Sequence, residues 1–181
     1  MAAAQRGLAV NDSYHFNHIV LGYIYLYQQQ YDQALAEMER AVAIAPTLAE
    51  NYAALAMGLS YMGRSADALE AAAQALRLKP NIADAHLAGV GSAYTVAGHY
   101  EEARPPLQRF LSRYPNRLDI HLMLTAVYSE LGQASEARAE AAEVLRRNPQ
   151  FSVEGMRRAC PYKDPEVLER YLDGLRKAGL K

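Results

Sequence analysis

This sequence of 181 residues has one cysteine, no tryptophan and almost no net charge. The single cysteine, Cys160, cannot form a disulfide within the chain and suits a reducing compartment. The formal net charge of −1 gives no overall field to draw the chain to nucleic acid or to an anionic membrane. No apolar run approaches the ~20 residues of a membrane span, and the N-terminus is too short for a secretory signal. These absences favour a cytoplasmic protein with neither a membrane nor a nucleic-acid partner.

Small residues and prolines return at a fixed spacing through most of the chain. One alanine and one proline each recur with steps of 34, 35 and 34 residues: Ala34, Ala68, Ala103 and Ala137, and Pro46, Pro80, Pro115 and Pro149. A fixed period of this length, with small, aromatic and proline residues in phase, is typical of stacked helical hairpins. The pattern predicts an all-α solenoid of about four hairpins.

This spacing resembles the tetratricopeptide repeat over about four fifths of the chain. The resemblance implies a right-handed α-solenoid with repeats at 13–46, 47–80, 81–115 and 116–149. The expected helices are 13–28 and 31–45, 48–62 and 65–78, 82–97 and 100–114, and 118–131 and 134–147. Asn11, Asp12 and Ser13 offer side-chain oxygens for the first N-cap, and Gly63, Gly98 and Gly132 fall in the turns.

Pro105 and Pro106 break this helical pattern, because they fall inside the second helix of the third repeat. Each removes one helical hydrogen bond, and an interior proline costs about 3 kcal/mol. We therefore expect this helix to be kinked or to start late.

The two ends of the chain depart from the repeat. Residues 1–12 align with the second helix of a preceding repeat, which would make the chain a piece of a longer protein, or they form an ordinary N-terminal capping helix. In residues 150–181, Asp164 and Pro165 are a strong helix start, and the helix from 165 to 178 has one apolar face. We expect it to cap the last repeat.

The C-terminal end also resembles a second family. It contains Asn148-Pro149-Gln150-Phe151-Ser152-Val153-Glu154, Pro161-Tyr162-Lys163-Asp164-Pro165 and Leu168-Glu169-Arg170-Tyr171-Leu172-Asp173-Gly174-Leu175. This ending is similar to the tail of bacterial class III adenylate or guanylate cyclases that carry tetratricopeptide repeats behind a catalytic domain. The resemblance implies a regulatory segment of a signalling protein, whereas no cyclase catalytic domain is present to carry the activity itself.

In tetratricopeptide arrays the first helices line a concave groove that binds peptides or partner helices. Counting along these helices gives the candidate groove residues Phe16, Ile19, Tyr23, Tyr27, Glu50, Met57, Tyr61, Ser92, Asp119, Leu122, Met123 and Glu130. No Lys or Arg occurs among them, and an amphipathic helix with a basic edge would suit such a groove. Two alternatives remain open: the tyrosines fill the groove themselves, or the chain is a structural module that self-associates through its solenoid ends, for example as a homodimer.

The sequence gives little support for a metal site, a reactive cysteine or a dinucleotide-binding turn. His15 and His18 would share one helix face, but no Cys, Asp or Glu stands at ligand spacing beside them, so no metal site is predicted. Cys160 has no activating neighbour, and the Gly89-Val90-Gly91 sequence lacks the strand and third glycine of a dinucleotide fingerprint. We expect neither a cofactor nor an enzyme.

Overall fold

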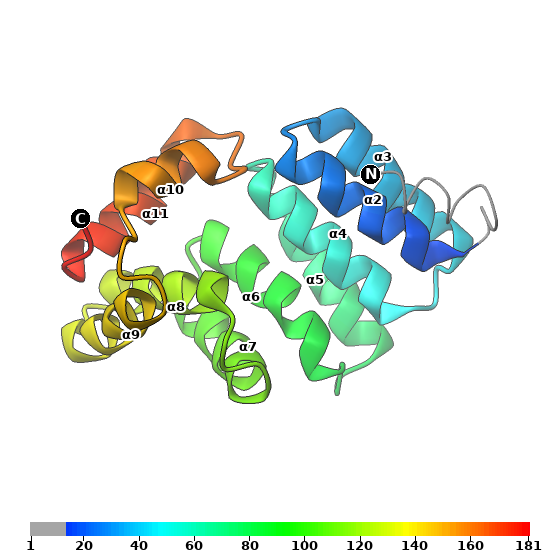
Figure 1. Cartoon of the computed structure of the whole chain (residues 1–181). Coiled ribbons are helices and arrows are strands. Elements are labelled where there is room, and N and C mark those ends of the chain that lie inside the picture. The colour runs from blue at the N-terminus through cyan, green and yellow to red at the C-terminus, as the bar shows by residue number, and fades with distance from the viewer. Residues whose placement is uncertain (1–13) are drawn as a thin grey trace.

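In the computed structural model, which describes residues 14–181, helices pair into four consecutive antiparallel hairpins (Figure 1). The helices are α2 (His15–Tyr27) and α3 (Tyr31–Ile44), α4 (Ala49–Tyr61) and α5 (Ser65–Leu78), α6 (Leu87–Val96) and α7 (Tyr100–Arg113), and α8 (Leu118–Glu130) and α9 (Ala134–Arg147). Within the described residues no strand occurs, so the fold is the all-α right-handed solenoid that the repeat period predicts.

Two further helices follow the fourth hairpin: α10 (Val153–Ala159) and α11 (Pro165–Lys177). In Figure 1 they turn back from the last hairpin. The loop between them reaches the end of α4, where the Lys163 amide bonds to the Tyr61 carbonyl oxygen. We call residues 150–181 the tail. Asp164 caps α11 by accepting hydrogen bonds from the amides of Glu166 and Val167, at 2.8 and 3.4 Å, and Pro165 follows in the first turn.

Small residues lie where the two helices of a hairpin meet. The four recurring alanines, Ala34, Ala68, Ala103 and Ala137, are at most 1% exposed. A Cβ on Gly22 would lie 2.7 Å from Met38 Cγ, and one on Gly91 would lie 2.5 Å from Leu107. Any larger side chain at these contacts would force the helices apart.

The N-terminal boundaries differ from two expectations. The first helix begins at His15 rather than at residue 13, and its N-cap, Tyr14, makes no side-chain cap bond. The predicted N-cap residues Asn11–Ser13 and the predicted helix within 1–12 lie outside the described residues.

The third hairpin also differs in its first helix, because residues Asp84–His86 form a 3-10 turn and α6 begins only at Leu87. This hairpin has the 35-residue step, and its extra residue lies between Pro80 and Gly91. The 3-10 turn lies in the same stretch.

The prolines of α7 do not delay its start. The helix runs without a break from Tyr100 to Arg113, with Pro105 and Pro106 in its second turn. The expectation of a late start is therefore wrong. The four recurring prolines, Pro46, Pro80, Pro115 and Pro149, lie just after second helices, where the helix has already ended.

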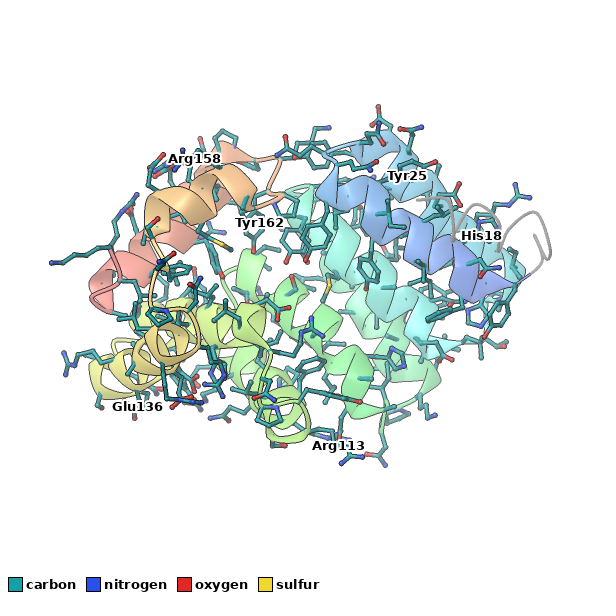
Figure 2. All side chains as sticks on the ribbon, viewed as in Figure 1. His18, Tyr25, Arg113, Glu136, Arg158 and Tyr162 are labelled. Atoms are coloured by element: carbon teal, nitrogen blue, oxygen red, sulfur yellow. The ribbon has the colours of Figure 1, made fainter. Side chains whose placement is uncertain are left out.

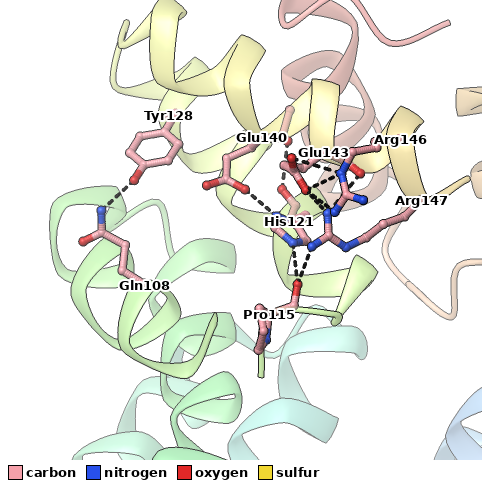
Figure 3. Close-up of polar contacts among 9 residues, drawn as sticks. Gln108, Pro115, His121, Tyr128, Glu140, Glu143, Arg146 and Arg147 are labelled. Atoms are coloured by element: carbon pink, nitrogen blue, oxygen red, sulfur yellow. Dashed lines mark hydrogen bonds and ion pairs between the residues drawn. The ribbon is translucent and has the colours of Figure 1, made fainter. Parts of the chain in front are cut away.

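A polar network joins the fourth hairpin to the loop before it (Figure 3). His121 Nδ1 lies 2.6 Å from the Glu140 carboxylate, and its Nε2 lies 3.0 Å from the Pro115 carbonyl oxygen. Arg147 donates a hydrogen bond to the same carbonyl at 2.7 Å. The first hairpin repeats the histidine contact, since His18 Nδ1 lies 2.6 Å from Glu37. These buried imidazoles therefore tie the two helices of a hairpin together.

Candidate functional site

A cavity of ≈ 430 Å³ opens on the concave side of the first two hairpins. We call it the concave cavity; α2 and α4 supply most of its wall, and the third hairpin and the start of α8 supply the rest. Its lining residues are Phe16, Ile19, Tyr23, Tyr27, Glu50, Ala54, Met57, Tyr61, Ala85, His86, Ala88, Phe110, Arg117 and Asp119. Phe16 and Tyr27 are 51% and 62% exposed, so a passing chain can reach their rings.

Eight of the twelve predicted groove residues line this cavity: Phe16, Ile19, Tyr23, Tyr27, Glu50, Met57, Tyr61 and Asp119. The structure does not bring the other four to it. Ser92, Leu122 and Met123 are at most 3% exposed. Glu130 lies against the tail, where the Lys177 ammonium donates to its carboxylate at 2.6 Å.

The tail occupies the concave side of the last two hairpins. Ser129 Oγ donates to the Gly174 carbonyl oxygen at 2.7 Å, and a Cβ on Gly174 would lie 3.0 Å from Ala126. The Arg170 guanidinium donates to the Val96 carbonyl oxygen at 2.7 Å. Because α11 lies where the groove would continue, the groove is open only along its N-terminal half.

The loop between α10 and α11 closes one end of the open part. The Lys163 amide donates to the Tyr61 carbonyl oxygen at 2.8 Å, and the Tyr162 and Tyr61 rings lie 4.9 Å apart. Figure 2 shows Tyr162 pointing from this loop toward the concave side. Tyr61 therefore contacts the tail and also lines the concave cavity.

The wall of the concave cavity also carries charged groups. The Arg117 guanidinium donates two hydrogen bonds to Asp119, at 2.9 and 2.7 Å, and lies over the Phe110 ring at 5.3 Å. Glu50 and His86 face the same space. Burial lowers the pKa of His86, Glu50 opposes that shift, and Lys79 adds to it.

The tyrosines of the cavity stay protonated at neutral pH. Burial raises the pKa of Tyr23, Tyr27 and Tyr61, and neighbouring hydroxyls and carboxylates add to the shift. Arg117 acts in the other direction on Tyr23 and Tyr27. Their hydroxyls can therefore donate hydrogen bonds to a ligand, and their rings provide apolar surface.

The repeat pattern did not predict several cavity residues. Arg117 is the N-cap of α8, His86 ends the 3-10 turn, and Phe110 belongs to the second helix of its hairpin. Counting along the faces of first helices cannot find such positions. The predicted groove set contained no Lys or Arg, whereas Arg117 lines the cavity.

His15, Cys160 and Gly89, which were considered for metal, thiol and nucleotide chemistry, lie in the following surroundings. His15 Nδ1 lies 2.7 Å from Asn51 Oδ1, and within residues 14–181 no three His, Cys, Asp or Glu side chains gather as a metal site would require. Burial raises the pKa of the Cys160 thiol from 9.0 to about 11. A Cβ on Gly89 would lie 2.0 Å from the Ala53 carbonyl oxygen, so this glycine serves a helix contact.

No helix among the described residues is long and apolar enough to cross a bilayer.

Comparison with known families identifies the hairpins. Family models described as the tetratricopeptide repeat match residues 16–48, 53–117 and 95–159. The chain is a tetratricopeptide repeat protein.

Solved structures of tetratricopeptide repeat type share the fold of this chain. PilW, a type IV pilus biogenesis factor, has a TM-score of 0.65 at 18% identity, covering 98% of this chain and 79% of PilW. PilF of Pseudomonas aeruginosa has a TM-score of 0.63 at 24% identity, covering 94% and 78% of the two chains. YrrB, described as having an unusual peptide-binding site, has a TM-score of 0.57 at 19% identity, covering 97% and 90%. At these identities the likeness shows the fold alone.

One curated protein is similar over a short stretch. "Putative adenylate cyclase 3" of Rhizobium meliloti (strain 1021) is 50% identical over 44 residues. The match spans 24% of this chain and only 8% of that protein.

Proposed function

We propose that this chain is a non-catalytic scaffold that binds a peptide or an amphipathic helix of a partner protein in the concave cavity. The observation that carries the proposal is an open cavity of ≈ 430 Å³ with exposed Phe16 and Tyr27 on its wall, left free while the tail covers the rest of the groove. Concave sites with aromatic walls and a few charged groups are typical peptide-binding surfaces. The tetratricopeptide fold supports a protein or peptide partner in general, and YrrB, which shares the fold, is described as having a peptide-binding site.

Selection from a displayed peptide library on the immobilised chain, followed by titration calorimetry of the selected peptides, tests this proposal. Tyr27→Ala should weaken binding roughly fivefold or more, because a truncated aromatic anchor commonly costs over 1 kcal/mol. Leu145→Ala is the matched control, since Leu145 is 41% exposed on α9 and does not line the cavity. Equal affinities for the wild type and Tyr27→Ala would contradict the assignment of the site.

We also propose a cellular context, in which the chain is a cytoplasmic regulatory segment of a bacterial cyclase-like signalling protein. The supports are the resemblance of its C-terminal end and the 44-residue similarity to a protein named as an adenylate cyclase. Sequencing upstream of Met1 tests the context: a cyclase catalytic domain in the same reading frame would support it, and a stop codon directly upstream would contradict it.

Self-association is the second candidate function. Tyr14 and Phe16 are 50% and 51% exposed, and their rings lie 6.1 Å apart at the start of the first hairpin. Neighbouring exposed rings favour a contact with another copy. Light scattering across a concentration series should then show a dimer that Tyr14→Ser weakens, whereas a monomer at every concentration would remove this candidate.

A further inference from the structure

We infer that Glu50 selects a lysine or arginine in the bound segment, so that the partner presents a basic side chain together with an aromatic or large apolar one. This inference rests on the proposed function, because it concerns the same concave cavity.

The cavity contains two carboxylates with different surroundings. Both oxygens of Asp119 accept hydrogen bonds from Arg117, so that charge is already compensated. In the part of the chain that the structure describes, no hydrogen bond or ion pair reaches the half-buried Glu50 carboxylate. With His86 uncharged, the cavity carries one negative charge in excess, and Glu50 is the group that can still take an ion pair.

Desolvation of the Glu50 carboxylate makes the affinity depend on the charge of the ligand. A ligand that fills the cavity removes water from Glu50, and a buried charge without a partner is costly. A ligand ammonium or guanidinium group compensates for that loss, an apolar side chain does not, and a ligand carboxylate adds repulsion. The expected order of affinity is therefore basic, then apolar, then acidic.

The cavity also separates the Glu50 carboxylate from a pair of tyrosine rings. Glu50 lies in the first turn of α4 and Tyr61 is its last residue, so the two are eleven positions, or about 16 Å of helix rise, apart. Tyr27 and Tyr61 form the aromatic end. An extended segment covers that distance with about five residues, at roughly 3.3 Å each.

The protonation state of His86 determines the pH at which ligand binding should be measured. Burial lowers its pKa from 6.5, so at pH 7.5 the ring is uncharged and does not compete for Glu50. Lys79 is the other charged group that acts on this ring, and it lowers the pKa further. At a pH below this lowered pKa a protonated His86 would partly neutralise Glu50, and the preference for a basic ligand should shrink.

Three synthetic peptides with blocked ends serve as probes: Phe-Ala-Ala-Ala-Lys, the same peptide ending in norleucine, and the same peptide ending in Glu. NMR titration of the full chain at pH 7.5 should give a dissociation constant roughly two- to fivefold lower for the Lys peptide than for the norleucine peptide, as a partly exposed ion pair allows. Glu50→Gln should remove this difference, and Glu50→Lys should make the Glu peptide the tightest ligand. Glu70→Gln, an exposed carboxylate on α5 outside the cavity, is the matched control and should leave the order unchanged.

Circular dichroism melting of each variant confirms folding before the titrations are compared. Equal binding of the three peptides, or a Lys preference that persists in Glu50→Gln, would overturn the inference and leave the proposed function standing. No binding by any of the three would count against both.

Discussion

Gln29 occupies a backbone conformation that the other hairpins give to glycine. Its φ is 59°, and at the equivalent turn the next three hairpins have Gly63, Gly98 and Gly132 at φ of 74°, 79° and 70°. A residue with a Cβ pays roughly 1–2 kcal/mol in this left-handed region, and glycine does not. The first turn therefore carries a local strain that the others lack.

Replacing Gln29 by glycine should stabilise the protein. The strain is relieved, but glycine gains freedom in the unfolded chain, so the expected net gain is about 0.5–1 kcal/mol in the free energy of unfolding by urea. Gly132→Gln is the matched change in the opposite direction, because a Cβ there meets no atom within 4 Å and only backbone strain remains. A loss of stability in Gln29→Gly would contradict the strain argument.

Single residues also show how much of the candidate site could be predicted from the sequence. Tyr27, Glu50 and Tyr61 were predicted because they face one side of a first helix, and the structure places all three in the cavity. Leu122 was predicted by the same rule, yet it is 2% exposed. Helical periodicity gives the direction of a side chain, but it does not tell what else packs there.

At the scale of elements, the repeat period predicted most helix boundaries to within one residue. The second helices α5 and α9 have the predicted ends, and α3 and α7 end one residue early. The tail was predicted as helices that cap the last repeat, but its position along the concave side was not predicted, because α11 meets α8 through contacts such as Ser129–Gly174, 45 residues apart. Contacts of that kind follow no period in the chain.

The prolines of α7 give a test at this scale. Pro105 is exposed in the second turn, so an alanine there would lose little packing and could donate a hydrogen bond to the carbonyl four residues earlier. Pro105→Ala should raise the free energy of unfolding by about 1–2 kcal/mol, since relief of the interior proline exceeds the lost restriction of the unfolded chain. Thermal or urea unfolding measures the change.

Pro165→Ala is the control for this test. Pro165 is also exposed but stands in the first turn of α11, where a proline removes no helical bond. It should leave stability unchanged or slightly lower. Equal stabilisation by both substitutions would show that the position of the proline within the helix does not matter.

At the scale of the molecule, the tail connects hairpins that are not neighbours in the array. Hairpins of a solenoid contact only their neighbours, so such arrays can fray from either end. Here the tail bonds to α4 through Lys163, to α6 through Arg170 and to α8 through Gly174. Loosening of the last hairpin therefore requires breaking contacts with the second and third as well.

Cys160 reports on this closure, because it lies in the tail and is 5% exposed. Burial raises the pKa of its thiol from 9.0 to about 11, and only the thiolate reacts. At pH 8 the two-unit shift alone should slow modification by a disulfide reagent about 100-fold relative to the chain unfolded in urea. If the tail is released as a unit, the labelling rate should rise together with proteolytic cleavage between α9 and α10 as urea increases. A native rate close to that of the unfolded chain would show that the tail does not hold the concave side closed.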